Sequence, residues 1–258
     1  MAEGTTSYYE GVLLRRAGLI SDTDLLSTKS GVITQLQNRP GRFETSLEEA
    51  SLDAWIKYYR QDQSAINNQI SYYDKGEVVS MMLDLAIRSA SDGKRSLDTV
   101  MKYLYEEFYK KGRNYTPEDY QKACELAAGR SLDDFFTKYV SGRDDIDYNA
   151  LLNPFGLTVN SSSQTNRSYL GATLAENDGR LMVRAVPVGT PAYEQGLNFN
   201  DQIVAVDGYR ASNAFLQSYL AQKKPGDTVR LSIFRFDKLR DMEIKLGNDN
   251  RVTLEIVP

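Results

Sequence analysis

Histidine is absent from the 258 residues of this chain, and cysteine occurs only once, at Cys124. The chain therefore lacks the imidazole pair and the thiolate cluster with which zinc sites are commonly built, and it cannot form an internal disulfide. Cys124 lies in a helical pattern, so we expect a buried, unreactive thiol. No hydrophobic run approaches the ~20 residues of a membrane-spanning helix.

An excess of positive charge is also missing. The net charge is -4 with a pI near 5.1, and basic residues cluster only in short pairs such as Lys110-Lys111. This balance argues against nucleic acid as the main partner. Hydrophobic residues make up 41% of the chain, which is enough for a folded core. The length suits one large domain or two of ordinary size.

Residues 1–152 have the periodicity and start signals of helices. In 77–90 and in 98–111, apolar residues recur at spacings of three and four and form one face. Ser46 and Glu49 form a capping-box pattern, and Thr116 precedes a proline at a first helical position. Several helices with short connections predict a helical bundle or half-domain.

The pattern changes after a polar, turn-prone run that we interpret as a linker at 153–165. Beyond it, alternating apolar residues such as Val229, Leu231 and Ile233 indicate short strands. The predicted strands are 181–188, 202–206, 228–236 and 242–246. The predicted fold class is therefore α + β in two domains, all-α in 1–152 and mainly β in 166–258.

Several motifs in the first domain resemble, in the same order, the motifs of one protein family. Residues 3–10 read EGTTSYYE, and residues 70–76 read ISYYDKG. Shorter motifs follow in the same order, with PGR at 40–42, SLDAW at 51–55 and GKRSLD at 93–98. On these motifs the chain resembles the glycyl aminopeptidase family of gluzincin zinc metallopeptidases, and the resemblance covers nearly all of residues 2–150.

The resemblance implies roles for two residues. Gluzincins hold zinc with two histidines of a HExxH helix and with a glutamate from a later helix, a position that Glu3 matches. A tyrosine commonly donates a hydrogen bond to the oxyanion that forms on the scissile carbonyl, and Tyr73 matches that position. Glu10 either supports the site beside Glu3 or is solvated. Trp55 is expected to anchor the core.

The missing histidines limit what this chain can do alone. We expect zinc in a longer parent protein, and none in this chain, because the HExxH half of the site is absent. A missing N-terminal half of the peptidase is therefore an expected partner.

The second domain carries four motifs in a fixed order. They are YLGA at 169–172, GTPAYEQGL at 189–197, DQIVAVDG at 201–208 and KPGDTV at 224–229. Together they resemble a PDZ domain of the kind attached to bacterial proteases. Such domains add a peptide strand to an exposed sheet edge and hold its terminal carboxylate in a loop of backbone N–H groups.

The PDZ resemblance implies a peptide-binding groove. The expected groove residues come from the loop, the edge strand and the facing helix: Tyr169, Leu170, Gly171, Ala172, Leu174, Leu216 and Leu220. No histidine begins the expected facing helix at 213–222, so a preference for a Ser or Thr hydroxyl near the end of the ligand is not indicated. A hydrophobic C-terminal residue is expected in the ligand. The expected partners are peptide or protein C-termini.

These observations predict the C-terminal part of a zinc aminopeptidase, inactive alone, with a PDZ module that binds peptide or substrate. Two alternatives remain open from the sequence. One is a non-enzymatic PDZ scaffold that binds a partner, and the other is a fragment without independent function. The sequence gives no indication of the compartment.

Overall fold

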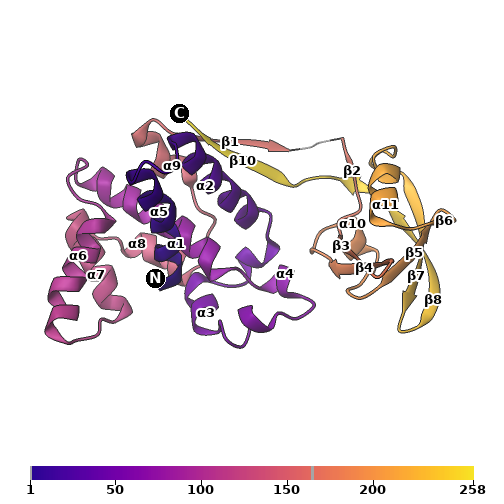
Figure 1. Cartoon of the computed structure of the whole chain (residues 1–258), viewed down its shortest axis with the longest axis horizontal. Helices are drawn as coiled ribbons and strands as arrows, with labels where there is room; N and C mark the ends of the chain where they lie inside the picture. The colour runs from indigo at the N-terminus through magenta and orange to yellow at the C-terminus, as the bar shows by residue number, and fades with distance from the viewer. Residues whose placement is uncertain (1, 164–165) are drawn as a thin grey trace.

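The computed structural model describes residues 2–163 and 166–258, which form a helical lobe, a β-rich lobe and a long two-stranded ribbon between them (Figure 1). The predicted α + β class, helical first and mainly β second, is confirmed. Each lobe has its own hydrophobic core. Within the described residues, every helix is too short or too polar to span a membrane.

The helical lobe contains nearly all of the long helices. Its α-helices are α1 (Ala2–Arg16), α2 (Asp22–Gln37), α3 (Leu47–Leu52), α4 (Ala65–Asn68), α5 (Tyr72–Ala90), α6 (Leu97–Glu107), α7 (Pro117–Ala128), α8 (Asp133–Phe136) and α9 (Tyr148–Leu152). Shorter helical turns connect them: η1 (Pro40–Phe43), η2 (Tyr58–Arg60), η3 (Tyr109–Lys111), η4 (Thr137–Ser141) and η5 (Asn153–Phe155).

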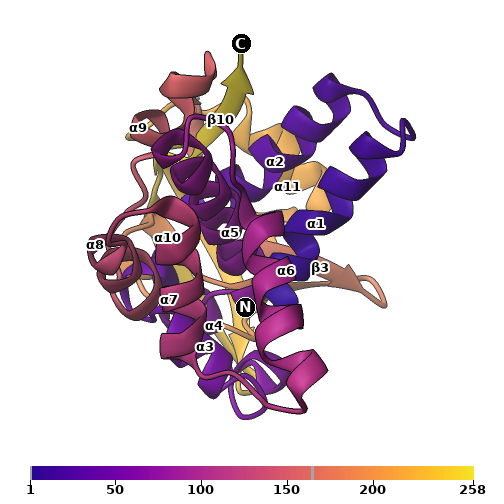
Figure 2. The ribbon, with the colours of Figure 1, turned by 90° about the vertical axis from the view of Figure 1, so that its left-hand side faces the viewer.

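Helix α5 is the centre of this lobe, with α1 and α2 on one side and α7 and α8 on the other (Figure 2). Ser71 begins it by accepting a hydrogen bond from the backbone N–H of Asp74. The predicted capping box at Ser46 is present, and the predicted helix start at Thr116 is a cap that also forms a capping box, with Asp119. Because α5 is buried on most of its surface, the helices around it hold it in place.

The β-rich lobe is built around one antiparallel sheet. Its elements are β2 (Ser168–Tyr169), β3 (Thr173–Asn177), β4 (Arg180–Ala185), α10 (Pro191–Glu194), β5 (Gln202–Val206), β6 (Tyr209–Arg210), α11 (Asn213–Leu220), β7 (Thr228–Arg235), β8 (Lys238–Lys245) and β9 (Gly247–Asn248). The strand order is β3-β4-β5-β7-β8, with β6 paired to β5. Val229, Leu231 and Ile233 of β7 are buried, as their alternation predicts. β3 lies at one edge of the sheet.

The ribbon consists of β1 (Thr158–Ser163) and β10 (Val252–Val257), paired antiparallel over their full length. The sequence suggested an irregular linker at 153–165 and a PDZ domain that continues to 258. The structure differs, because the polar run is a strand and residues 252–257 return to the helical lobe. The last two linker residues, 164 and 165, lie outside the described residues.

Helix α2 holds β10 through three polar side chains spaced four residues apart. Ser30 Oγ accepts from the N–H of Ile256 at 2.8 Å, Thr34 Oγ1 from that of Leu254 at 2.8 Å, and Asn38 Oδ1 from that of Val252 at 2.9 Å. Four helical residues rise about 6 Å and two strand residues about 6.7 Å. The two periods therefore match, and Leu254 and Ile256 join the helical core.

A second contact joins the lobes directly. The side chain of Asn67 in α4 donates to the carbonyl of Val186 at 3.0 Å and accepts from the N–H of Val188 at 2.8 Å. Both partners lie in the turn between β4 and α10. The β-rich lobe is thus attached to the helical lobe at two places, by the ribbon and by this amide.

Candidate functional site

Two glycines set the crossing of α1 and α5. A Cβ added to Gly4 would lie 2.4 Å from the Cα of Gly76, and one added to Gly76 would lie 2.9 Å from the Cα of Gly4. Only glycine allows the two backbones to come so close. Gly4 follows Glu3 in α1, and Gly76 lies three residues after Tyr73 in α5. The crossing therefore brings the two predicted site residues into one region.

Tyr73 is part of a group of phenols at the start of α5. The hydroxyl of Tyr59 in η2 lies 2.7 Å from the Tyr73 hydroxyl and 3.0 Å from that of Tyr72. The pKa of Tyr73 is raised, chiefly by its hydrogen bond with Tyr59, and the negative charge of Glu3 raises it further. A phenol in this setting stays protonated, as a hydrogen-bond donor must. Tyr59 was not identified from the sequence.

The rest of the EGTTSYYE motif anchors α1. The hydroxyl of Tyr8 donates to Asp84 Oδ2 at 2.7 Å, and Asp84, which is 3% exposed, also accepts from Arg88 and from the N–H of Leu97. The hydroxyl of Tyr9 donates to Asp98 at 2.7 Å. These bonds tie α1 to α5 and α6. Glu10 is exposed, as expected for a solvated side chain.

The residues present do not fit a zinc ion by themselves. No group of three or more His, Cys, Asp or Glu side chains within residues 2–163 and 166–258 is arranged to hold a metal. Glu3 is exposed on α1 and contributes one carboxylate, whereas a protein zinc site needs three or four ligands. The described residues therefore support no zinc-dependent catalytic step by this chain alone.

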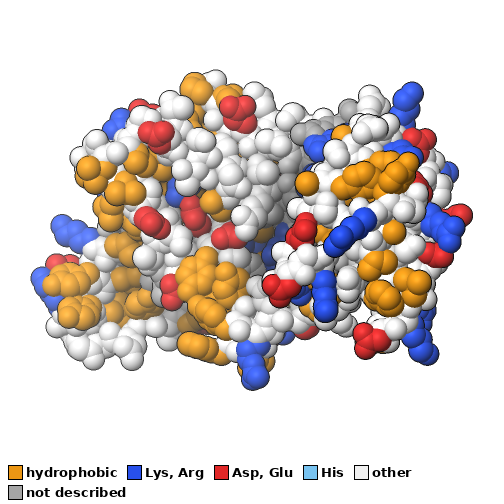
Figure 3. Space-filling model, turned by 45° about the vertical axis from the view of Figure 1, so that its right-hand side comes forward, with side chains coloured by type: hydrophobic (Ala, Val, Ile, Leu, Met, Phe, Trp, Pro, Cys, Tyr) orange, Lys and Arg blue, Asp and Glu red, His pale blue; other side chains and the backbone are white. Residues whose placement is uncertain are grey.

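The prediction that Trp55 anchors the core is wrong. Trp55 is 78% exposed, and its ring packs on Tyr59 with the ring centroids 5.0 Å apart. Leu52, at 84% exposure, and Ile56, at 69%, lie beside it in the chain. Hydrophobic side chains gather at several places on the helical lobe (Figure 3). Residues 52–59 thus form an exposed apolar segment that leads to the phenol group.

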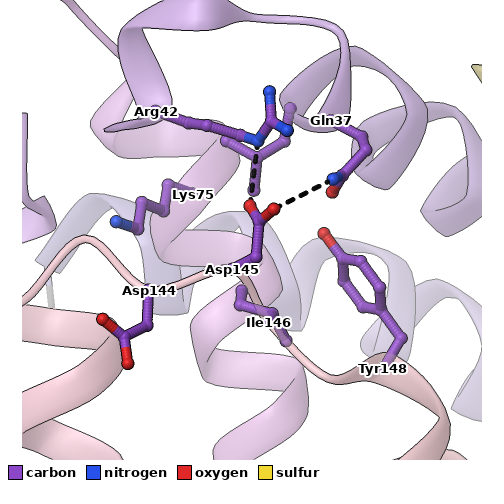
Figure 4. A pocket seen from close by; sticks show the side chains of 8 residues that line it. Gln37, Arg42, Lys75, Asp144, Asp145, Ile146 and Tyr148 are labelled. Carbon is purple, nitrogen blue, oxygen red and sulfur yellow. Dashed lines mark hydrogen bonds and ion pairs between the residues drawn. The ribbon is translucent and has the colours of Figure 1, made fainter. Parts of the chain in front are cut away.

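Lys75, within the ISYYDKG motif, is buried without a partner. It is 2% exposed, and its Nζ makes no hydrogen bond to the described residues. It lies at a small cavity of about 10 Å³, lined also by Asp144 and Tyr148, where Arg42 and Gln37 bind Asp145 instead (Figure 4). Burial lowers the pKa of Lys75 to about 8, and the charge of Asp145 offsets only part of that effect.

The β-rich lobe contains a polar cavity of about 160 Å³ between the edge strand β3 and α11. Six of the predicted groove residues line it: Tyr169, Leu170, Gly171, Ala172, Leu174 and Leu220. Leu216 does not, because its side chain is fully buried in the core of the lobe. Gln217 and Ala221 face the cavity from α11 instead.

Gly171 fixes the loop at the end of this groove. Its φ is +83°, and an added Cβ would lie 2.2 Å from the Cβ of Thr190. Thr190 Oγ1 donates to the carbonyl of Gly171 at 2.9 Å, and the N–H of Ala192 donates to that of Leu170 at 2.8 Å. The loop carbonyls therefore point toward α10. This leaves the opposite side of the loop for a ligand.

Arg251 and Asp249 also line the groove, and sequence reasoning missed both. They follow β9, beyond the four PDZ-like motifs, so no motif pointed to them. Arg251 donates Nε and Nη2 to the two oxygens of Asp249, at 2.8 and 2.7 Å, and its guanidinium lies 4.8 Å from the centre of the Tyr169 ring.

Comparison with known proteins agrees with both halves of this description. Residues 1–79 match the family model of the M61 glycyl aminopeptidases, and residues 168–246 match that of the PDZ domain. The first 79 residues are thus similar to a segment of the M61 glycyl aminopeptidases, and residues 168–246 to a PDZ domain. The family resemblance predicted from the sequence is thereby confirmed.

Two individual proteins extend the comparison. The crystal structure of an aminopeptidase N family protein from Idiomarina loihiensis is 29% identical with a TM-score of 0.91, and the match covers 99% of this chain and 46% of that one. A protein of Synechocystis sp. (strain ATCC 27184 / PCC 6803 / Kazusa), named as a serine protease, HhoA, is 34% identical over 91 residues. That match covers 34% of this chain and 23% of the relative. The chain therefore spans less than half of either protein.

Proposed function

We propose that this chain is the C-terminal part of a zinc-dependent aminopeptidase, in which Glu3 and Tyr73 form one side of the catalytic centre. The close crossing of α1 and α5 at Gly4 and Gly76 carries the proposal, because it gathers the two motif residues near the surface of the lobe. The match to the M61 family over residues 1–79 supports it.

In this proposal each residue has a limited task. The protonated hydroxyl of Tyr73 donates a hydrogen bond to the negative oxygen that develops on a scissile carbonyl. Glu3 supplies one carboxylate ligand. Because the 258 residues include no histidine, the imidazole ligands and the general base must come from polypeptide other than these residues. The isolated chain is then inactive and binds zinc weakly.

A zinc titration tests this expectation. We expect isothermal titration calorimetry of the purified chain to show no stoichiometric zinc binding at micromolar concentration, because a single carboxylate ligand binds zinc weakly. The variant Glu3→Gln serves as the control and should give the same trace. One tight zinc ion per chain that is lost in Glu3→Gln would contradict the proposal.

The second proposed function is peptide binding at the PDZ groove, which holds whether or not the chain belongs to an enzyme. Strand β3 pairs with β4 on one side only, so its other edge is open to an added strand. Leu170, Leu174 and Leu220 line the cavity next to this edge. A peptide with a hydrophobic C-terminal residue suits such a groove.

Replacing Gly171 by valine is expected to weaken peptide binding more than tenfold, since the side chain would overlap Thr190 and displace the loop. Fluorescence anisotropy with labelled peptides that end in Leu, Val or Ile measures the effect. Gly208→Ala is the matched control, because Gly208 has a φ of +82° with open space around it. Equal affinity of Gly171→Val and wild type would exclude this groove as the binding site.

A further inference from the structure

Arg251 occupies an unusual place for a groove residue. It follows the last strand pair of the β-rich lobe and directly precedes β10, so it belongs to the segment that returns to the helical lobe. Its neighbour Val252 exchanges two hydrogen bonds with the side chain of Asn38, at 2.9 and 2.7 Å. The backbone next to Arg251 is therefore held by the residue that caps α2, while the side chain of Arg251 lines the groove.

The side chain of Arg251 is fixed as well. Asp249 is 2% exposed and binds Arg251 through Nε and Nη2, which leaves Nη1 outside the bidentate pair. The guanidinium also packs over the ring of Tyr169, the first residue of the groove loop. A guanidinium held in this way needs little ordering when a ligand arrives.

The local charge favours an anion. The guanidiniums of Arg167 and Arg251 and the carboxylate of Asp249 line the cavity. The loop from Leu170 to Ala172 lines the same cavity and follows Tyr169, on whose ring the Arg251 guanidinium packs. Among the hydrogen bonds of the described residues, the N–H groups of Gly171 and Ala172 have no acceptor. An anionic group placed there could bind backbone N–H donors and a guanidinium together.

We propose that Arg251 binds the terminal carboxylate of a peptide in the PDZ groove and so selects free C-termini over internal or blocked segments. The inference rests on the proposed peptide binding at this groove. In the inferred site, the carboxylate is bound both by N–H groups of the groove loop and by a guanidinium that lies outside the sheet of the β-rich lobe. A second consequence follows from the position of Arg251 beside β10, because the helical lobe helps to hold the residue that contacts the ligand.

The test compares two peptides of one sequence, one with a free C-terminal carboxylate and one with a C-terminal amide, both ending in a hydrophobic residue. With the complete chain, we expect the free acid to bind at least tenfold more tightly in fluorescence anisotropy. Arg251→Gln should reduce that ratio to about two or less by weakening the acid alone. Arg251→Lys should recover part of it, since a lysine keeps the charge without the planar fork.

Two further variants keep the test decisive. Arg240→Gln removes the same charge from β8, at the opposite edge of the sheet, and should leave the ratio unchanged. Because Arg251→Gln removes the guanidinium that binds both oxygens of the buried Asp249, the double variant Asp249→Asn with Arg251→Gln checks the result in a neutral, hydrogen-bonding pair. Circular dichroism confirms that each variant is folded.

The outcomes separate the two proposals. If wild type binds both peptides but Arg251→Gln and the double variant keep the acid-to-amide ratio, the role of Arg251 is overturned and the groove remains a peptide site. If wild type binds neither peptide, peptide binding at this groove fails, and the inference fails with it.

Discussion

Replacing Gly4 by alanine is expected to lower the free energy of unfolding of the helical lobe by about 1–3 kcal/mol, the usual range for overpacking. The added methyl carbon would lie 2.4 Å from the Cα of Gly76, which is backbone and cannot rotate away. Helices α1 and α5 would have to separate. The same movement would draw Glu3 away from Tyr73, so the substitution also disturbs the proposed catalytic side of the lobe.

Urea unfolding followed by circular dichroism at 222 nm measures this change, because most of the helix lies in this lobe. Gly31→Ala is the matched control. Gly31 lies in α2 with no atom near an added Cβ, so alanine there should stabilise the chain by up to about 1 kcal/mol through helix propensity. If Gly4→Ala were as stabilising as Gly31→Ala, the close helix crossing would be refuted.

Replacing Lys75 by methionine is expected to raise the free energy of unfolding at pH 7 by roughly 3 kcal/mol. A pKa lowered from 10.5 to about 8 corresponds to roughly that cost of keeping the ammonium charged in the folded chain. Methionine keeps most of the length of the side chain and needs no hydrogen bond. The substitution thus removes the unpaired charge beside Asp144 and Asp145 (Figure 4).

The gain should depend on pH in a defined direction. Between pH 8 and 10.5 the unfolded chain binds more protons at Lys75 than the folded chain does, so the stability of wild type rises with pH in this window. Below pH 8 the lysine is charged in both states and the full cost remains. The advantage of Lys75→Met should therefore be constant below pH 8 and shrink toward pH 10.5.

Urea unfolding midpoints of wild type and Lys75→Met, measured from pH 6 to pH 10, test this pH dependence of the stability difference. Lys102→Met is the control, because Lys102 is exposed on α6, and a surface change of this kind stays within about 0.5 kcal/mol. A loss of stability in Lys75→Met beyond that in Lys102→Met would show that Lys75 is paired in solution, and a gain without pH dependence would show that the pKa of Lys75 is not lowered. A water at the adjacent cavity, which has room for about one molecule, is the partner that would then be sought by crystallography.

The two attachments between the lobes bear on the proposed function. Asn67 binds the turn after β4, and Thr190, at the end of that turn, packs on Gly171 of the groove loop. On the other side, Arg251 joins the groove to the ribbon held by α2. The β-rich lobe is therefore attached to the helical lobe at two places next to its groove loop.

The sequence by itself determined the elements that depend on neighbouring residues. The capping box at Ser46, the capped helix start at Thr116 and the alternation in β7 all appear where the pattern placed them. Each rests on interactions within a few residues, so the local order of side chains was sufficient. The motifs that carried the family resemblance were equally readable, because they are contiguous.

Tertiary structure alone decided which distant segments meet. It returned residues 252–257 to α2 at a separation of more than 200 residues and left Trp55 in solvent. It enclosed Lys75 without a hydrogen-bond partner among the residues that the structure describes. It also brought Arg251 to the groove, where no motif had placed it. None of these follows from periodicity, because burial and charge pairing are properties of surfaces that exist only after the chain has folded.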